Sequence, residues 1–565
     1  MAEEKQEPVR HGGAHAVAAA RLHGVSTMFT LSGGHVFPLY DGAVKADPPM
    51  RMVDVRHEQT AVFAAEATTR LTRAPGLAVV TAGPGVTNTV SAITTAWFNG
   101  SPVVVLGGRA PDYRWGAGGL QEIDHPPLLA PVTKRAWTEH QASGVGAAVD
   151  EAFRLASAPH RGPVFVDFAM EALFGDGGPD LPAAAPGGQE PAAAAGPDPA
   201  DVEAIAGLLA RASRPVLVLG SDVWLTGADA AAREAACALR LPVVANGQGR
   251  GILPAGHELL VTRARSAAFG AADLVLVAGT PLDFRLGYGE FGGRDGNGPA
   301  QVVHVADSPG HLATHRALAA SAAGDLTSFF TMLAEAVPTA MREAGAAAAP
   351  WAGTWLPRLT AAARDAIAAD QTLLASDADP VHPMRVYGEL AQVLDDDAVV
   401  IGDGGDFVSY AGKYLEPRRP GGWLDPGPYG CLGTGLGYAI AARVARPSAQ
   451  VVLLLGDGAA GFSLMDADTL VRHRLPVVMI CGNNGIWALE KYPMQALYGY
   501  DVLADLQQGC RYDDVVRALG GAGETVTRPD AIGPALRRAF EAGVPYLVNV
   551  ITDPAVAYPR STTGV

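Results

Sequence analysis

Short apolar runs that end in Gly, Asn or Asp recur along the chain, and they constrain its fold more than any other feature. Examples are PVVVLGG at 102–108, PVLVLGSD at 215–222, VVLLLGDG at 451–458 and PVVMICGNN at 476–484. Runs without alternating polar residues are typical of strands buried on both faces of a parallel sheet. Ala-rich stretches of helical length lie between them, so strand alternates with helix. The sequence therefore predicts an α/β fold of open parallel-sheet domains.

The apolar runs fall into three groups, which predict three domains. A chain of 565 residues is too long for a single hydrophobic core, and two stretches rich in Pro, Ala and Gly separate the groups. The predicted segments are 1–172 (N-terminal domain), 173–199 (linker), 200–335 (central domain), 336–374 (linker), 375–555 (C-terminal domain) and 556–565 (a polar tail, either disordered or an active-site flap).

Composition and charge limit the kinds of partner. The net charge of -16 argues against a general nucleic-acid binder. The four cysteines have no CxxC spacing, which indicates free thiols in a reducing compartment. The N-terminus lacks an apolar signal core, and no apolar run reaches membrane-spanning length. We therefore expect a cytoplasmic protein with neither nucleic acid nor membrane as a partner.

Two polar side chains follow neighbouring apolar runs where each predicted strand ends. Asp457 stands between Gly456 and Gly458, and Asn484 follows 27 positions later. In open parallel sheets, ligands bind beyond the carboxyl ends of the strands, and two such oxygens with a nearby carbonyl can hold Mg²⁺. The alternative is an Asp and an Asn that stabilise two ordinary turns. The spacing and the Asn-Asn-Gly sequence favour the metal.

This combination resembles the cofactor motif of the thiamine-diphosphate-dependent decarboxylase and acetolactate synthase superfamily, and the resemblance covers nearly the whole chain. It implies that the N-terminal domain binds the cofactor pyrimidine and that the C-terminal domain binds the diphosphate, with a central domain between them. It implies thiamine diphosphate and Mg²⁺ as cofactors, with Asp457, Asn484 and the carbonyl of Ile486 as metal ligands. It also implies a homodimer or homotetramer, because a Glu of one subunit acts on the cofactor of its neighbour in this family.

Glu58 matches that Glu, at the start of an Ala-rich predicted helix. In the family, a carboxyl group here hydrogen-bonds pyrimidine N1′ and favours the imino tautomer, whose nitrogen removes the thiazolium C2 proton. The alternative is a structural role, because the helix dipole favours a Glu at a helix N-terminus. The Asp457 and Asn484 motif downstream favours the catalytic interpretation.

Further segments match family positions around the cofactor. The Gly-rich turn TAGPGVTN, from Thr81 to Asn88, is by itself a weak phosphate-loop signal, and the resemblance places it near the pyrimidine. In DPGPYGCLG, the resemblance places Leu432 as the apolar wedge beneath the thiazolium and the Gly430 carbonyl as acceptor of the 4′-amino hydrogen. The alternative is a Gly-rich turn before a core helix.

The segment FTLSGGHVFPLYDG at 29–42 resembles the acetolactate synthase pattern Gly-Gly-x-x-x-Pro-Leu-Tyr-Asp and places Gly34 at the cofactor. Ser32 replaces the Pro of that pattern. His35 is an unexpected polar residue beside the expected reaction centre, where it could orient a substrate oxygen or simply pack at a domain edge. Gln121, in GGLQEIDH, matches an active-site Gln of the family, with a surface loop as the alternative.

The sequence of the central domain helps to distinguish the branches of the superfamily. Its stretch 263–285 resembles the region that helps to hold FAD in acetolactate synthases and lies near the CoA nucleotide in acyl-CoA-acting members. The synthase pattern Asp-Asp-Arg is here Asp-Phe-Arg at 283–285, which weakens the FAD interpretation. Arg263, Arg265 and Arg285 are candidate partners for CoA phosphates, with ordinary surface arginines as the alternative.

Glu490 is a carboxylate six residues beyond Asn484, in an otherwise apolar segment. Pyruvate decarboxylases carry a Glu at the matching position, where it handles protons on the bound intermediate. We expect Glu490 to be partly desolvated and to have a raised pKa that suits proton exchange near neutral pH. The alternative is a solvated turn residue paired with Lys491.

Together these residues predict a thiamine-diphosphate- and Mg²⁺-dependent carbon–carbon lyase. GLGYAIAA at 435–442 is similar to the acyl-CoA branch, so the expected substrate is a 2-hydroxyacyl-CoA, such as 2-hydroxyisobutyryl-CoA, cleaved to a ketone or aldehyde plus formyl-CoA. The alternatives are an acetolactate synthase-type carboligase on pyruvate and a flavin-dependent pyruvate oxidase type. A catalytically silent binding subunit is disfavoured by the presence of Glu58, Asp457 and Asn484.

Overall fold

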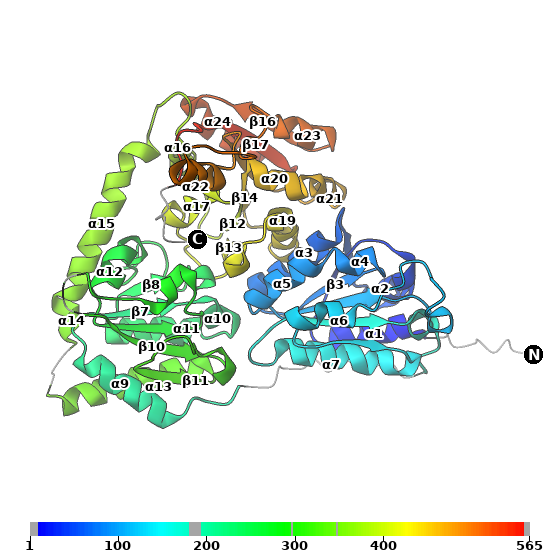
Figure 1. Ribbon diagram of the computed structural model, residues 1–565, viewed down its shortest axis with the longest axis horizontal. Helices are drawn as coiled ribbons and strands as arrows, with labels where there is room; N and C mark the ends of the chain where they lie inside the picture. The colour runs from blue at the N-terminus through cyan, green and yellow to red at the C-terminus, as the bar shows by residue number, and fades with distance from the viewer. Residues whose placement is uncertain (1–9, 180–193, 295, 297, 346–348, 559–565) are drawn as a thin grey trace, which may run out of the picture. The chain divides into compact units, whose positions relative to one another are not determined.

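The computed structural model describes residues 10–179, 194–294, 296, 298–345 and 349–558. Three parallel β-sheets with covering helices organise them (Figure 1), which confirms the predicted α/β class. None of the helices in these residues is long and apolar enough to span a bilayer. The chain forms two compact units: a first unit of Met1–Ala193 with Tyr429–Ala441, and a second unit of Ala194–Pro428 with Ala442–Val565.

The first unit is built on a six-stranded sheet whose order is β2-β1-β3-β4-β6-β5. Its strands are β1 (Thr27–Thr30), β2 (Arg51–Asp54), β3 (Gly76–Val80), β4 (Val103–Gly108), β5 (Ala136–Glu139) and β6 (Val164–Phe168). Every residue of β3, β4 and β6 is buried, as expected for strands covered on both faces. The principal helices are α1 (Gly12–Leu22), α2 (Phe37–Lys45), α3 (Glu58–Thr72), α5 (Val90–Phe98) and α7 (Val145–Ser157).

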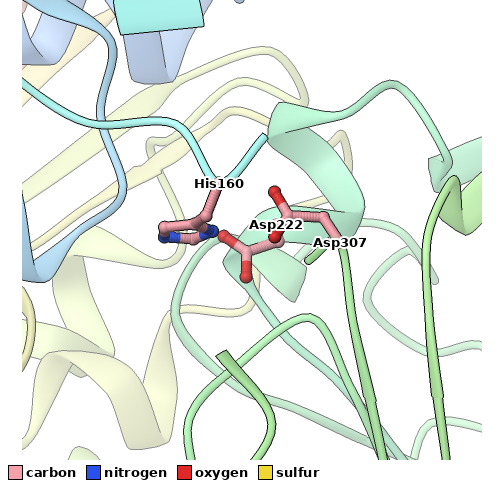
Figure 2. A group of neighbouring side chains, drawn as sticks. All are labelled: His160, Asp222 and Asp307. Atoms are coloured by element: carbon pink, nitrogen blue, oxygen red, sulfur yellow. The ribbon is translucent and has the colours of Figure 1, made fainter. Parts of the chain in front are cut away.

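The central domain, in the second unit, has a five-stranded sheet of order β11-β10-β9-β7-β8. Its strands are β7 (Pro215–Leu219), β8 (Val243–Ala245), β9 (Leu274–Ala278), β10 (Gln301–Ala306) and β11 (Ala320–Ala323), and its main helices are α9 (Pro199–Arg211), α11 (Asp229–Leu239) and α13 (Leu326–Glu343). Asp222 and Asp307 follow β7 and β10; Figure 2 draws them with His160. His160 is a residue of the first unit, so these three side chains are not a site within one unit.

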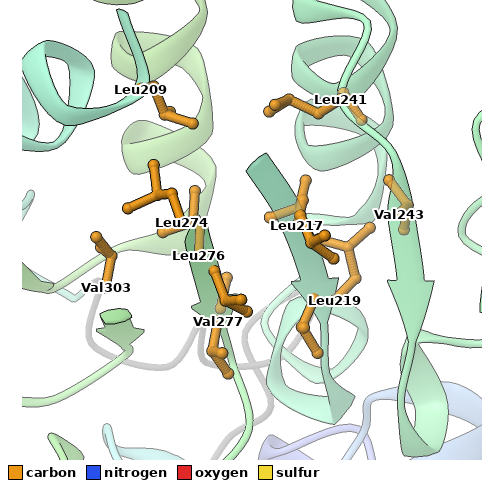
Figure 3. Close-up of a cluster of buried hydrophobic side chains, with 14 of the residues drawn as sticks. Leu209, Leu217, Leu219, Leu241, Val243, Leu274, Leu276, Val277 and Val303 are labelled. Atoms are coloured by element: carbon orange, nitrogen blue, oxygen red, sulfur yellow. The ribbon is translucent and has the colours of Figure 1, made fainter. Parts of the chain in front are cut away.

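The core of the central domain is aliphatic. Figure 3 shows Leu217, Leu219, Leu274 and Leu276 of the adjacent strands β7 and β9 side by side, and all four are buried. Full burial of each such side chain stabilises the fold by roughly 1.5–3 kcal/mol relative to exposure.

The C-terminal domain, also in the second unit, has a six-stranded sheet of order β13-β12-β14-β15-β17-β16. Its strands are β12 (Val399–Asp403), β13 (Trp423–Leu424), β14 (Val451–Gly456), β15 (Val478–Asn483), β16 (Ala522–Val526) and β17 (Tyr546–Ile551). Its helices include α16 (Pro383–Leu390), α17 (Asp406–Ser409), α20 (Asp457–Ser463), α22 (Ala488–Tyr498), α23 (Tyr512–Ala518) and α24 (Pro529–Glu541). The strands β14 and β15 are adjacent and parallel, with Gly456 opposite Gly482.

The segment 336–374, expected to be a linker, contains the end of α13 and the whole of α15 (Trp355–Leu374). Two tryptophans attach it to the central domain. The indole N–H of Trp351 donates to the Leu239 carbonyl at 3.2 Å, and that of Trp355 donates to the Pro215 carbonyl at 3.0 Å. Both rings are buried, so this connection is mainly helical and packed.

The other predicted connections are described only in part. Residues 180–193 of the linker over 173–199, and residues 559–565 of the tail, lie outside the described residues. The described end of the tail is held by the C-terminal domain. The backbone N–H of Tyr558 donates to Asp406 Oδ1 at 2.5 Å, and the Tyr558 ring packs edge-on against Tyr410.

Candidate active site

Asp457 and Asn484 lie at one edge of the C-terminal sheet, because each follows one of the adjacent parallel strands β14 and β15. Asp457 is 5% exposed. Its Oδ2 accepts a hydrogen bond from the Gly485 N–H at 2.6 Å, and its Oδ1 accepts one from the Gly458 N–H at 2.9 Å. The Asp457 carboxylate therefore links the turn after β14 to the turn after β15.

The side-chain and carbonyl oxygens at this edge of the sheet are suitable ligands for Mg²⁺. Burial raises the pKa of Asp457 to about 6, although hydrogen bonds from the backbone of Gly485 and Gly458 oppose the shift. A divalent cation would stabilise the charged carboxylate far better than neutral amides do. Together with Asn484 and the Ile486 carbonyl, Asp457 offers the oxygen ligands that Mg²⁺ prefers, with positions left for phosphate oxygens.

Two glycines allow these turns to close. A Cβ on Gly458 would lie 2.3 Å from the Trp487 ring, so only Gly fits there. Gly485 has φ +69, and a Cβ on it would lie 2.3 Å from Gln508, whose side chain donates to the Gly485 carbonyl at 3.0 Å. The Gly-Asp-Gly and Asn-Asn-Gly sequences thus have a steric origin as well as a chemical one.

The two asparagines of the Asn-Asn-Gly sequence have different environments. Asn483 is buried, and its amide donates to the Cys510 carbonyl at 2.9 Å and to Asn549 Oδ1 at 3.1 Å. These bonds tie β15 to β17 and occupy the Asn483 side chain. Asn484 Oδ1 instead accepts from the Ile486 N–H at 3.2 Å, within the proposed metal-binding turn.

Glu58 is the first residue of α3 in the first unit and is 9% exposed. The amide of Asn88 donates to Glu58 Oε2 at 3.0 Å. Two residues singled out from separate motifs, 30 positions apart, are therefore in direct contact. Asn88 caps the short helix α4 (Pro84–Thr87) and fixes the orientation of the Glu58 carboxylate.

His35 contacts the other end of the same Gly-rich turn. Its Nδ1 lies 3.0 Å from Thr81 Oγ1, and the side chain is 8% exposed. Burial, and secondarily the proximity of His125, lowers the pKa of His35. A Cβ on Gly33 would overlap the Thr81 side chain, and a Cβ on Gly108 would lie 2.4 Å from the His35 Cβ. These glycines leave room for the His35 imidazole beside Thr81.

Gln121 packs against the middle of this turn. It has a left-handed backbone, with φ 62, and a Cβ on Gly83 would lie 2.8 Å from the Gln121 Cβ. The side chain is partly buried. Gln121 therefore lies in a largely exposed loop that contacts the Gly-rich turn.

The segment around Leu432 belongs to the first unit and packs on its helices. The Tyr429 ring stacks on Phe98 of α5 with ring centroids 5.3 Å apart. A Cβ on Gly437 would lie 2.7 Å from the Phe63 Cβ of α3. Leu432 is half-buried, and Gly430 has φ +68 with open space where a Cβ would be. Their roles at the cofactor stay predictions.

Glu490 corrects one expectation. It lies in the first turn of α22 and is exposed in this chain, not partly desolvated. The neighbouring Lys491 binds Asp501 at 2.9 Å and Asp505 at 2.7 Å. The apolar neighbours of Glu490 pack elsewhere: the Trp487 ring lies beside Gly458, and the Leu489 side chain lies beside Gly405.

If Glu490 exchanges a proton with the bound substrate, Glu490→Gln should lower kcat by about 10²–10⁴-fold, the usual cost of lost acid–base catalysis. Binding of thiamine diphosphate should be unchanged, because Gln keeps the shape and hydrogen bonding of Glu. Isothermal titration with cofactor and steady-state kinetics measure the two effects. Wild-type kcat in this variant would leave Glu490 as a solvated residue of α22.

The three arginines expected at CoA phosphates are already engaged within the second unit. Arg263 donates to Asp370, Arg265 donates to the Arg285 carbonyl, and Arg285 forms a bidentate pair with Asp283. Burial lowers the pKa of Arg265 to about 10. An incoming phosphate would have to displace these partners, so the arginines are poorer candidates than the sequence indicated.

Comparison with known proteins identifies three domains of one enzyme family. Residues 10–128 match the family model "Thiamine pyrophosphate enzyme, N-terminal TPP binding domain", residues 202–333 match its central domain, and residues 403–550 match its C-terminal TPP binding domain.

Full-length relatives carry two different names. The "Acetolactate synthase large subunit IlvG" of Mycobacterium tuberculosis and the "Probable acetolactate synthase" of Mycobacterium bovis are each 48% identical over 555 residues, covering 97% of both chains. The human "2-hydroxyacyl-CoA lyase 2" is 34% identical over 589 residues, covering 96% of this chain and 90% of that protein. This chain belongs to the thiamine-pyrophosphate-dependent enzyme family.

Proposed function

We propose that the protein is a carboligase of the acetolactate synthase type, which joins two pyruvate molecules with loss of carbon dioxide. The observation that carries the proposal is the 48% identity, over 97% of both chains, to proteins named as acetolactate synthases. The Gly-Gly-x-x-x-Pro-Leu-Tyr-Asp pattern at 33–41 supports it. This ranking reverses the expectation from sequence, which placed the acyl-CoA lyase first.

The paired arginines of the central domain also support the smaller substrate. Pyruvate has a single carboxylate and needs no nucleotide-binding region, whereas CoA carries phosphates that require unpaired cations or backbone amides. Arg263 and Arg285 are each neutralised by an aspartate. The central domain can thus serve a pyruvate carboligase as it stands.

The candidate site residues have separate expected roles. Asp457, Asn484 and the Ile486 carbonyl would hold Mg²⁺ and, through it, the diphosphate. Glu58, oriented by Asn88, would exchange a proton with pyrimidine N1′. Thiamine diphosphate, when bound, would supply the carbon nucleophile that the reaction requires.

A 2-hydroxyacyl-CoA lyase is the second candidate. Its support is the 34–35% identity to the human and mouse proteins of that name. A cavity of about 420 Å³ in the second unit, lined by Arg263, Lys413, Tyr414 and other residues, is within the size range of ligand pockets. Arg263 and Lys413 both form ion pairs with Asp370, which also lines this cavity.

Product analysis separates the two candidates. With thiamine diphosphate and Mg²⁺, pyruvate should yield acetolactate, and a panel of 2-hydroxyacyl-CoAs should yield little formyl-CoA. Formyl-CoA formation without acetolactate would identify the protein as the lyase instead.

If the protein is the lyase, Lys413→Gln should raise the KM for the acyl-CoA. The matched control is Lys45→Gln, a variant at an exposed ion pair of α2.

A further inference from the structure

A buried histidine–aspartate pair lies beneath the Gly-rich turn of the first unit. His125 and Asp167 are both 0% exposed, and His125 Nδ1 lies 2.7 Å from Asp167 Oδ2. Asp167 stands in β6, between apolar residues, opposite Gly107 of β4 and Thr138 of β5. A carboxylate at the centre of a sheet is costly unless it is paired and hydrogen-bonded, so its presence requires a reason.

The hydrogen bonds fix the tautomer of His125. The backbone N–H of Gly83 donates to His125 Nε2 at 3.0 Å. A backbone amide can only donate, so Nε2 carries a lone pair and the ring proton is on Nδ1. Nδ1–H therefore donates to Asp167. The aspartate selects this tautomer, as the carboxylate does in a catalytic triad.

Arg109 completes the support of Asp167. Its guanidinium NH1 lies 3.6 Å from Asp167 Oδ2 and 3.1 Å from Asp124 Oδ1. It also stacks over the Trp115 ring at 3.7 Å. Among the described residues, Asp167 Oδ1 has no hydrogen-bond partner. The bond to His125 is thus the main directional contact of this carboxylate.

Gly83 is the residue through which the pair reaches the cofactor turn. It has φ +61, a conformation that favours glycine, and it precedes Pro84 at the start of α4. One end of the turn is Thr81, which contacts His35, and the other end is Asn88, which contacts Glu58. His125 anchors the middle of a turn whose ends hold two candidate catalytic side chains.

We propose that His125, in the tautomer that Asp167 fixes, is a positioning residue, which holds the Gly83 amide and thereby keeps Asn88 against the Glu58 carboxylate. The consequence is that His125 sets the rate at which Glu58 exchanges a proton with the cofactor pyrimidine. The inference rests on membership of the thiamine-dependent family and not on the choice between pyruvate and acyl-CoA.

Three variants test the route through Gly83. In His125→Gln, the amide reaches the position of Nε2 and can still accept from Gly83. In His125→Asn, the amide reaches only the position of Nδ1, so the bond to Asp167 survives and the bond to Gly83 is lost. His23→Gln is the matched control, because His23 bonds Asp150 at 2.9 Å and stacks on Phe153 in the same unit.

Two measurements need no substrate. The first is amide hydrogen exchange of the apoprotein, in the peptide that covers 81–88. The second is H/D exchange at thiazolium C2 in protein loaded with thiamine diphosphate and Mg²⁺. His125→Asn should speed the amide exchange and slow C2 exchange by about 10²-fold, the cost of displacing a catalytic group by about 1 Å. His125→Gln should stay within about threefold of wild type for C2 exchange, and His23→Gln should change neither rate.

Slow C2 exchange in His125→Asn with unchanged amide exchange over 81–88 would overturn the route through Gly83. Equal C2 exchange in wild type and His125→Asn would overturn the proposal altogether. If that variant does not fold, ¹⁵N-histidine NMR of the wild-type protein decides, with the His125 signals assigned from His125→Gln. The proposal requires the Nδ1–H tautomer, and an Nε2–H tautomer would refute it. Because no substrate is used, failure of the carboligase proposal leaves this result intact.

Discussion

Replacing Asp457 with Asn should weaken Mg²⁺-dependent binding of thiamine diphosphate by about 10²–10⁴-fold, since losing one partner of a buried charge pair costs about 3–5 kcal/mol. Asp457 is the only charged member of the proposed ligand set, and it is 5% exposed. The substitution removes the charge and also turns an amide NH₂ toward one of the two backbone donors, Gly458 or Gly485. Both changes disfavour the metal.

Isothermal titration of the metal-depleted protein with thiamine diphosphate, at fixed Mg²⁺, measures this loss. Asp513→Asn is the matched control, because Asp513 is another buried carboxylate of the C-terminal domain, where it binds Arg511 and Thr525. It should lower the melting temperature and leave cofactor affinity near wild type. Unchanged affinity in Asp457→Asn would remove Asp457 from the metal site.

The features that depend on local sequence could be predicted. Strands without polar residues must be covered on both faces, and the carboxyl ends of parallel strands share one edge of a sheet. For this reason, the spacing of Asp457 and Asn484 was sufficient to predict their proximity, which the pairing of Gly456 with Gly482 produces. Glu58 and Asn88 also follow strands of one sheet, β2 and β3, on either side of β1.

The features that depend on distant partners could not be predicted. Arg263 and Asp370 are 107 positions apart, and neither segment indicates that the other neutralises it. His125 and Asp167 are 42 positions apart. The one signal was an Asp inside the apolar run PVFVDF at 163–168, an uncommon residue in a buried strand. Glu490 shows the converse error, since apolar neighbours along a helix do not imply burial of every residue between them.

Replacing Glu58 with Gln should slow H/D exchange at thiazolium C2 by about 10²–10⁴-fold, because Gln keeps the shape of Glu and cannot carry the proton. Asn88 donates to Glu58 Oε2 at 3.0 Å, and the Gln carbonyl can accept the same bond, so the turn should remain in place. Binding of the diphosphate should be preserved, since its expected ligands, Asp457 and Asn484, are unchanged. The measurement is quenched-flow exchange in D₂O followed by NMR of the released cofactor.

Glu66→Gln is the matched control for Glu58→Gln. Glu66 is fully buried in the same helix α3, where it accepts hydrogen bonds from Asn99 and Ser101. Its substitution should destabilise the fold without slowing C2 exchange, which separates the chemical role of Glu58 from the general cost of altering a buried carboxylate. Wild-type C2 exchange in Glu58→Gln would refute the assignment.

Subunit mixing tests whether Glu58 acts on the cofactor of a neighbouring subunit in the proposed homo-oligomer. In that case, mixing inactive Glu58→Gln and Asp457→Asn subunits should restore part of the activity, because some sites of the hybrid oligomers then contain both wild-type residues. Absence of recovery after demonstrated subunit exchange would place both residues in the site of a single chain.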